Sequence, residues 1–94
     1  MLEKRNHVLS IGLPVHNGEK FIRKAIESIL SQTFTDFELI ISNNASTDLT
    51  EQICNEYKEK DNRIKYFYQK QYFDWVGNYN FVLDKAKGKY FVWL

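Results

Sequence analysis

The sequence is poor in the residues on which disulfides, metal clusters and flexible loops depend. Its 94 residues include one cysteine, two histidines, one proline and four glycines. Cys54 therefore has no internal disulfide partner, and neither histidine stands near it at a metal-ligand spacing. We expect Cys54 to be an inert, half-buried thiol.

An excess of one charge and a long apolar run are also missing. The 13 basic and 12 acidic side chains leave a formal charge of +1, so no long-range field would gather nucleic acid or anionic lipid. The opening residues MLEKRNH lack the apolar core of a secretion signal, and no stretch of about 18 apolar residues could span a bilayer. We expect no nucleic-acid partner, no transmembrane segment in this part and a cytoplasmic location.

What the sequence does contain is an alternation of apolar runs and amphipathic segments. With 44% hydrophobic and 27% charged residues, it supports one compact domain over 1–94. Short apolar runs predict strands over Val8–Leu13, Phe37–Ser42, Ile64–Gln69 and Tyr90–Leu94, the first of them apolar on both faces. Helical spacing predicts helices over Glu19–Gln32, after Asp48, and from about Asn78. Strands that recur at about the length of a βαβ unit predict an α/β fold, a Rossmann-like parallel sheet with flanking helices (βαβαβαβ).

Two predicted helix ends carry specific signals. Asp48, followed three residues later by Glu51, resembles a capping box at the start of the second helix. Gly88 is a natural residue for the left-handed turn that ends the third helix, and Lys85 suits its C-terminal dipole.

Open parallel sheets bind ligands beyond the carboxyl ends of their strands. This rule selects the loops Pro14–Glu19 and Asn43–Asp48 and whatever follows Leu94. Neither G-x-G-x-x-G nor G-x-x-x-x-G-K-[ST] occurs, which disfavours a dehydrogenase or an ATPase. A phosphoacceptor domain would need carboxylates at strand ends that read LPVHN and YFYQK, and no Ser-His-Asp spacing stands out.

The selected loops carry polar side chains that could hold a nucleoside. His16 could stack on a base, and Asn43 and Asn44 each offer a donor and an acceptor for a base edge. Asparagine at a strand-to-helix turn is also an ordinary turn or cap residue, and a loop histidine is often only solvated. The pattern alone leaves both interpretations open.

A series of motifs nevertheless resembles the opening of the family-two glycosyltransferases, which have the GT-A fold. In order they are the loop P-V-x-N-G-E, the helix end S-I-L-S-Q-T, the strand F-E-L-I-I-S, the turn N-A-S-T-D and the segment N-Y-N-F-V-L-D-K-A-K-G-K-Y. Together they cover nearly all of the chain. The resemblance implies the nucleotide-binding N-terminal part of a GT-A domain, a truncated half-domain.

The activity that the resemblance implies is transfer of a sugar from a nucleoside-diphosphate sugar to an acceptor hydroxyl, usually with inversion. The acceptor would be a glycan or a lipid-linked glycan in polysaccharide or cell-envelope synthesis, at the inner face of the membrane in the full-length protein. The implied nucleotide-binding residues are Pro14, Val15, His16, Glu19, Asn43, Asn44 and, near the donor site, Asn78.

The family binds Mn²⁺ or Mg²⁺ through an acidic D-x-D-like motif after the fourth strand, a position just past Leu94. The family's catalytic carboxylate comes later still. We therefore expect no metal-binding or catalytic residue among these 94 and no transferase activity from them alone.

Four positions depart from the family pattern. His16 stands where tyrosine is common, which keeps a flat ring and adds an imidazole that can carry a proton. Asn43 replaces a frequent aspartate, which leaves the identity of the base open. Asp74 and Leu49 stand where glycine is usual.

Two other functions remain open at this stage. Aromatic residues concentrate between Tyr66 and Phe81, as in a module that stacks single-stranded bases, although cores and interfaces use aromatics in the same way. A nonenzymatic nucleotide-binding or interaction module of the same fold is the second alternative. The fourth strand would present an exposed edge, which predicts self-association.

Overall fold

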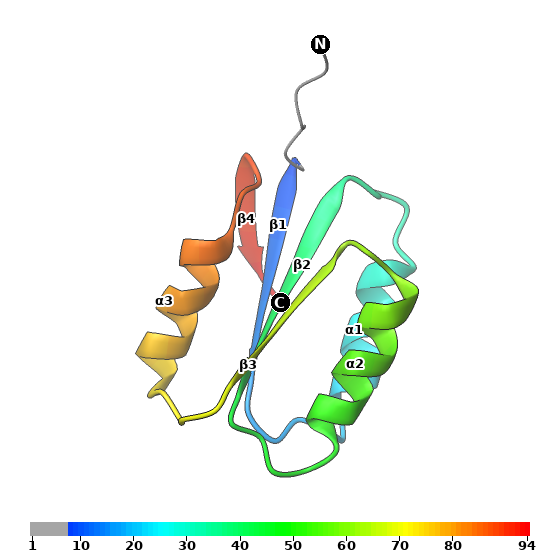
Figure 1. The fold of residues 1–94 in the computed structure, drawn as a ribbon. Coiled ribbons are helices and arrows are strands. Elements are labelled where there is room, and N and C mark those ends of the chain that lie inside the picture. The colour runs from blue at the N-terminus through cyan, green and yellow to red at the C-terminus, as the bar shows by residue number, and fades with distance from the viewer. Residues whose placement is uncertain (1–7) are drawn as a thin grey trace.

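The structure is a computed structural model that describes residues 8–94, so the opening segment MLEKRNH lies outside the described residues. Strands and helices alternate along this part of the chain (Figure 1). Their order is β1 (Leu9–Val15), α1 (Ile22–Leu30), β2 (Phe37–Asn44), α2 (Thr50–Lys60), β3 (Ile64–Gln69), α3 (Trp75–Lys85) and β4 (Tyr90–Trp93).

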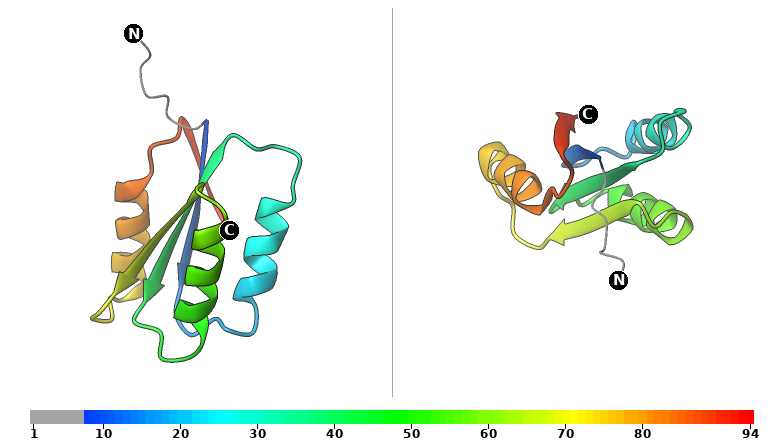
Figure 2. Two further views of the ribbon diagram at one scale, coloured as in Figure 1. Left: turned by 45° about the vertical axis from the view of Figure 1, so that its right-hand side comes forward. Right: turned by 90° about the horizontal axis from the view of Figure 1, so that it is seen from above.

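The strands form one parallel sheet in the order β3-β2-β1-β4. β1 pairs with β2 from Leu9 opposite Phe37 to Val15 opposite Asn43. α1 and α2 cover one face of the sheet, and α3 crosses the other face to reach β4 (Figures 1 and 2). The predicted Rossmann-like α/β fold is confirmed, and the carboxyl ends of the strands meet at one edge.

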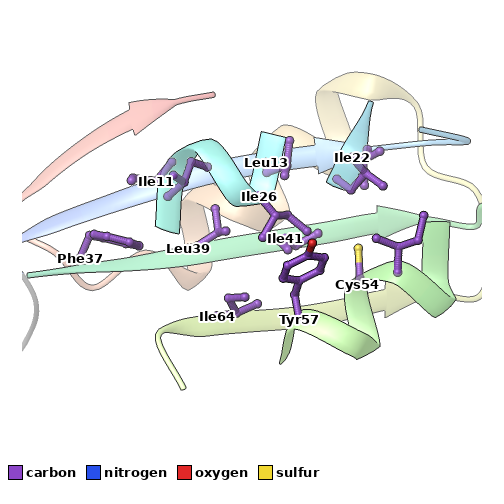
Figure 3. Packing of buried hydrophobic residues seen from close by; sticks show 13 residues of the cluster. Ile11, Leu13, Ile22, Ile26, Phe37, Leu39, Ile41, Cys54, Tyr57 and Ile64 are labelled. Carbon is purple, nitrogen blue, oxygen red and sulfur yellow. The ribbon is translucent and has the colours of Figure 1, made fainter. Parts of the chain in front are cut away.

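The hydrophobic core lies between the sheet and the helices α1 and α2 (Figure 3). Alternate residues of β1 and β2, such as Ile11 and Leu39, face Ile22 and Ile26 of α1. Each buried aliphatic side chain of this kind contributes roughly 1.5–3 kcal/mol. Cys54 is fully buried here rather than half-buried, and burial, aided by a nearby carboxylate, raises the pKa of its thiol to about 12. The thiol is therefore protonated and unreactive, as expected.

On the face that α3 covers, β1 contributes the small residues Ser10 and Gly12 beside the fully buried Ile40 of β2, so the first strand is buried on both faces as predicted but is apolar on only one. A Cβ on Gly12 would lie 2.8 Å from Cγ1 of Val82, which shows how closely α3 approaches. Buried Glu38 accepts hydrogen bonds from the Ser10 hydroxyl at 2.6 Å and from the Lys87 N–H at 2.7 Å. The Glu38 carboxylate thereby fixes the turn between α3 and β4.

The third helix differs from the prediction at both ends. It begins at Trp75 instead of near Asn78, because the Asp74 carboxylate accepts a hydrogen bond from the Gly77 N–H at 2.7 Å and caps the helix there. At its other end the chain leaves through Ala86 in an extended conformation, with φ −69° and ψ 133°. No glycine within residues 8–94 has a positive φ, so Gly88 is not a left-handed C-terminal cap.

The start of α2 is held by a carboxylate from a different loop. Asp48 accepts hydrogen bonds from the Thr50 N–H at 2.9 Å and the Glu19 N–H at 3.1 Å, and the Glu19 carboxylate accepts one from the Leu49 N–H at 2.9 Å. Glu19 thus takes the reciprocal part that the sequence assigned to Glu51. Partial burial would raise the pKa of Asp48, but the bonds from Thr50 and Glu19 outweigh it and lower the pKa.

Replacing Gly88 with alanine is expected to destabilise the protein by roughly 1–3 kcal/mol, because of overpacking. The new Cβ would meet backbone atoms that cannot move aside, the Ser10 nitrogen at 2.7 Å and the Leu9 carbonyl carbon at 2.8 Å. Gly77→Ala is the matched control, since its Cβ would meet no backbone atom and only side-chain atoms, the nearest being the flexible Asp74 carboxylate at 3.1 Å and the Phe73 Cβ at 3.3 Å. Chemical denaturation measures both; equal stabilities would contradict this packing.

The variant Asp48→Asn is expected to unfold at a lower temperature than the wild type at pH 7. Because folding lowers the pKa of Asp48, this carboxylate stabilises the folded protein at pH values above its ordinary pKa of 3.8. That stabilisation is lost as the pH falls below this value. The difference in Tm should therefore shrink below that pH. Thermal unfolding from pH 7 to pH 2 tests this, with Asp84→Asn, at an exposed site on α3, as the control. A difference independent of pH would contradict the assignment.

Candidate functional site

The carboxyl edge of the sheet gathers the loops that follow β1, β2 and β3 (lower edge in Figure 1). β4 pairs with the opposite side of β1 from β2, so the strand order reverses beside β1. Ligands of open α/β sheets bind at such a reversal, beyond the strand ends. This edge is therefore the candidate site.

Hydrogen bonds connect the loop after β1 to the loop after β2. The Asn17 N–H donates to Oγ of Ser46, and the Thr47 N–H donates back to Oδ1 of Asn17, each at 2.8 Å. One residue on, the Gly18 N–H donates to the buried hydroxyl of Thr50 at 2.8 Å. Together with the bonds between Glu19 and the start of α2, these contacts make the two loops one rigid rim.

Two non-glycine residues of this rim have a left-handed backbone. Asn17 has φ 51° and Ala45 has φ 53°. Asparagine tolerates this region better than most residues, whereas alanine adopts it at a cost of roughly 1–2 kcal/mol. The surrounding bonds offset that cost, since the Ala45 N–H itself donates to the Asn43 carbonyl at 3.0 Å.

His16 is exposed on the rim, and both of its ring nitrogens have partners. Nδ1 lies 2.5 Å from the Asn44 carbonyl oxygen, and Nε2 lies 3.3 Å from Nδ2 of Asn17. Because a carbonyl only accepts, Nδ1 carries the hydrogen and Nε2 is the acceptor. The imidazole is thereby held in one orientation with part of its surface open to a ligand.

Asn43 and Asn44 are the last residues of β2 rather than turn residues, and both are buried. The Asn43 amide donates to the Tyr66 hydroxyl at 2.9 Å, and burial above all raises the pKa of that phenol to about 12. The Asn44 amide donates to the Phe73 carbonyl and accepts from the Phe73 N–H, both at 2.8 Å. Both side chains support the rim from within, and their contact with a base stays a prediction.

Asn78 is buried beneath the edge, between α3 and the sheet. Its Oδ1 accepts from the Ser42 hydroxyl at 2.5 Å, and its Nδ2 donates to the Ser42 carbonyl at 3.3 Å. Gln69 donates to the same hydroxyl at 3.2 Å. The Asn78 side chain therefore docks α3 on β2 in this structure, and its role near a donor is likewise still a prediction.

The remaining predicted residues, Pro14, Val15 and Glu19, differ in their exposure. Pro14 and Val15 form the end of β1, where Pro14 is half-buried and Val15 is buried. β4 pairs with β1 only as far as Gly12, so the absent N–H of Pro14 disrupts no pairing with β4. Glu19 is exposed. Of all the predicted residues, His16 and Glu19 alone are exposed.

Sequence reasoning missed the third loop of the edge, residues 70–74. Tyr72 is 61% exposed and places its ring edge-on to that of His16, with the centroids 4.9 Å apart. The signal was available, since β3 of a parallel sheet must end at the same edge as β1 and β2. Asn17, Ser46 and Thr50 were also missed, because a local pattern does not show which distant turn it will contact.

The described residues provide no group for a metal ion. Nowhere in residues 8–94 do three histidine, cysteine, aspartate or glutamate side chains lie together in a way that could hold one. The residues present therefore do not fit Mn²⁺ or Mg²⁺. In the same part of the chain, each helix is too short or too polar to traverse a lipid bilayer.

The comparisons with known proteins agree with this geometry. A glycosyltransferase of Rickettsia typhi, itself uncharacterized, is 40% identical over 93% of this chain and 26% of its own length. The GalNAc(5)-diNAcBac-PP-undecaprenol beta-1,3-glucosyltransferase of Campylobacter jejuni is 38% identical over 92% of this chain and 28% of its own. The chain thus spans only about a quarter of these curated relatives.

Solved structures give the same result. TarS of S. aureus is similar with a TM-score of 0.82 and 28% sequence identity, over 92% of this chain and 26% of TarS residues 1–349. Its complex with UDP is similar with a TM-score of 0.80. Residues 10–94 match the family described as Glycosyl transferase family 2. The chain belongs to that glycosyltransferase family, and its sheet corresponds to the N-terminal part of a GT-A fold.

Proposed function

We propose that this chain forms the donor-nucleotide side of an enzyme that transfers a sugar from a nucleoside-diphosphate sugar to an acceptor hydroxyl, with inversion. The observation that carries the proposal is the exposed, oriented ring of His16 on a rigid rim at the strand reversal. The likeness to TarS in complex with UDP supports it. The C. jejuni relative, a glucosyltransferase named for an undecaprenol-linked substrate, supports a glycan or lipid-linked acceptor in cell-envelope synthesis.

The chemistry divides between this chain and the rest of such an enzyme. The rim binds and orients the nucleoside, whose planar base stacks on His16. The hydrogen bonds between the two loops keep the His16 ring in place. Mn²⁺ or Mg²⁺, bound by residues outside those described, would stabilise the charge on the departing diphosphate. The base that takes the acceptor proton lies outside them as well, and a cytoplasmic location stays part of the prediction.

Nucleotide titration of the protein tests the proposal. With UDP, dTDP, GDP and CDP in the presence of Mn²⁺, we expect one base to bind most tightly in calorimetry, and UDP is the first candidate. His16→Ala should weaken that binding about tenfold, because a stacked base contributes roughly 1–3 kcal/mol. His16→Phe should largely retain the affinity.

The matched control for His16→Ala is Phe34→Ala. Phe34 is also an exposed ring, at 45%, but it lies between α1 and β2, at the opposite edge of the sheet. Binding of no nucleotide by the wild type, or equal losses in both variants, would overturn the proposal. Because these residues alone are expected to transfer no sugar, only nucleotide binding without sugar transfer by the full-length protein would favour the nonenzymatic module of the same fold.

A second copy of the chain is proposed as a partner at β4. Tyr90 and Val92 pair in register with Leu9 and Ile11, so they point to the same face of the sheet as the core. They remain 60% and 45% exposed. An apolar edge strand of this kind favours pairing with another edge.

Sedimentation is expected to show concentration-dependent dimers of the wild type and monomers of Val92→Lys, since a charge on an edge strand opposes edge pairing. Val76→Lys is the matched control, because Val76 of α3 is 46% exposed on a different surface. A wild-type monomer at all concentrations, or the same change in both variants, would contradict self-association at this edge.

A further inference from the structure

The segment between β3 and α3 is fixed at its two ends and at one point between them. Gln69, the last residue of β3, lies opposite Asn44 in the sheet, and Asp74 caps α3. Between them, the Phe73 backbone is clamped by the Asn44 amide, which donates to the carbonyl and accepts from the N–H, both at 2.8 Å. Asn44 itself is only 3% exposed, whereas Phe73 is 37% exposed, so the clamp is anchored from the buried side of the segment.

Asn44 also holds the ring of His16. The backbone carbonyl of Asn44 accepts the hydrogen bond from Nδ1 of His16, at 2.5 Å. Its side chain fixes Phe73, the neighbour of Tyr72, whose ring meets that of His16 edge to face. Asn44 thus positions both rings, one through its main chain and one through its side chain.

Tyr72 is largely exposed although it contacts His16 and adjoins the clamped Phe73. Although its backbone neighbour is clamped and its edge is packed on His16, the side chain stays 61% exposed. Packing against His16 therefore uses only part of the ring, and the rest of the side chain is exposed beside His16 on the rim. An aromatic face that is both ordered and open is suited to a planar base.

We propose that Asn44 is a positioning residue that sets His16 and Tyr72 as one aromatic corner, and that Tyr72 is a second contact for the base of the bound nucleotide. The proposal rests on the nucleotide-binding function given above. It assigns part of the site's affinity for the base to the segment after β3. Asparagine suits the task because its amide donates and accepts at once, whereas aspartate would place a carboxylate against the Phe73 carbonyl.

A double-mutant cycle on nucleotide affinity tests whether Asn44 acts through Tyr72. Tyr72→Ala should weaken binding of the preferred diphosphate about tenfold, as loss of a stacking ring does. Asn44→Ala, which keeps the main-chain bond to His16, should weaken it to a similar extent. The double variant should lose no more than either single variant, whereas losses that multiply to about a hundredfold would overturn the proposal.

Two further variants separate the ring's role from a general loss of structure. Tyr72→Phe keeps the aromatic ring on which the base would stack, so this variant should retain near wild-type affinity for the nucleotide. Tyr90→Ala removes a ring with nearly the same exposure, 60% against 61%, on β4, and should leave the affinity unchanged. Loss of affinity in Tyr72→Phe or in Tyr90→Ala would overturn the role of Tyr72.

Hydrogen exchange at the Phe73 amide tests the clamp without any nucleotide. Asn44→Ala should speed this exchange while Tyr72→Ala leaves it protected. Unchanged exchange in Asn44→Ala would overturn the inference. If the clamp responds but the wild type binds no nucleotide, the positioning role is upheld and the proposed function fails. Should Asn44→Ala not unfold cooperatively, Asn44→Asp takes its place in the affinity cycle, where the same losses are expected because its carboxylate faces the Phe73 carbonyl. That carboxylate still accepts from the Phe73 N–H, so exchange at this amide should stay slow in Asn44→Asp.

Discussion

The parallel pairing of β1 with β2 is the constraint on which the site depends. Because Val15 lies opposite Asn43 in the sheet, the chain leaves both strands at the same level and the two turns must lie side by side. Every contact of the rim follows from that register, including the bond from the Asn17 N–H to Ser46. A shift of one residue in the pairing register would move each partner to the opposite face of the sheet and break the hydrogen bonds between the two turns.

Buried polar groups, rather than glycine-rich turns, give the edge its shape. Within residues 8–94, every buried side-chain nitrogen and oxygen has a hydrogen-bond partner. Glu38 holds the turn before β4, Asn43 reaches Tyr66, and Asn78 ties α3 to β2. A partner lost from such a network leaves a buried group unpaired, which costs roughly 1–3 kcal/mol, so these residues specify one arrangement of the loops. The rigid rim that results is what the proposed nucleotide site requires.

The element pattern was predictable because it depends on local periodicity, and all four strands and three helices of the described residues lie close to their expected places. Errors fell where a distant group decides the outcome. α2 is capped by Glu19 from another loop, and Gly88 is required for its close approach to Ser10 rather than for a left-handed turn. Neither partner is near in sequence, so no local pattern could have indicated it.

The sequence by itself determined the α/β class, the family and the two turns that meet at the edge, because apolar spacing and short motifs are carried by neighbouring residues. Only the tertiary structure decided what each site residue does. β2 extends through Asn44, and side chains alternate along a strand, so Asn43 turns toward α2 and β3 while Asn44 turns toward the segment before α3. Two adjacent asparagines that look equivalent in the sequence therefore serve opposite faces, and Tyr72 joins His16 only because the sheet brings residues that are far apart in the chain to one corner.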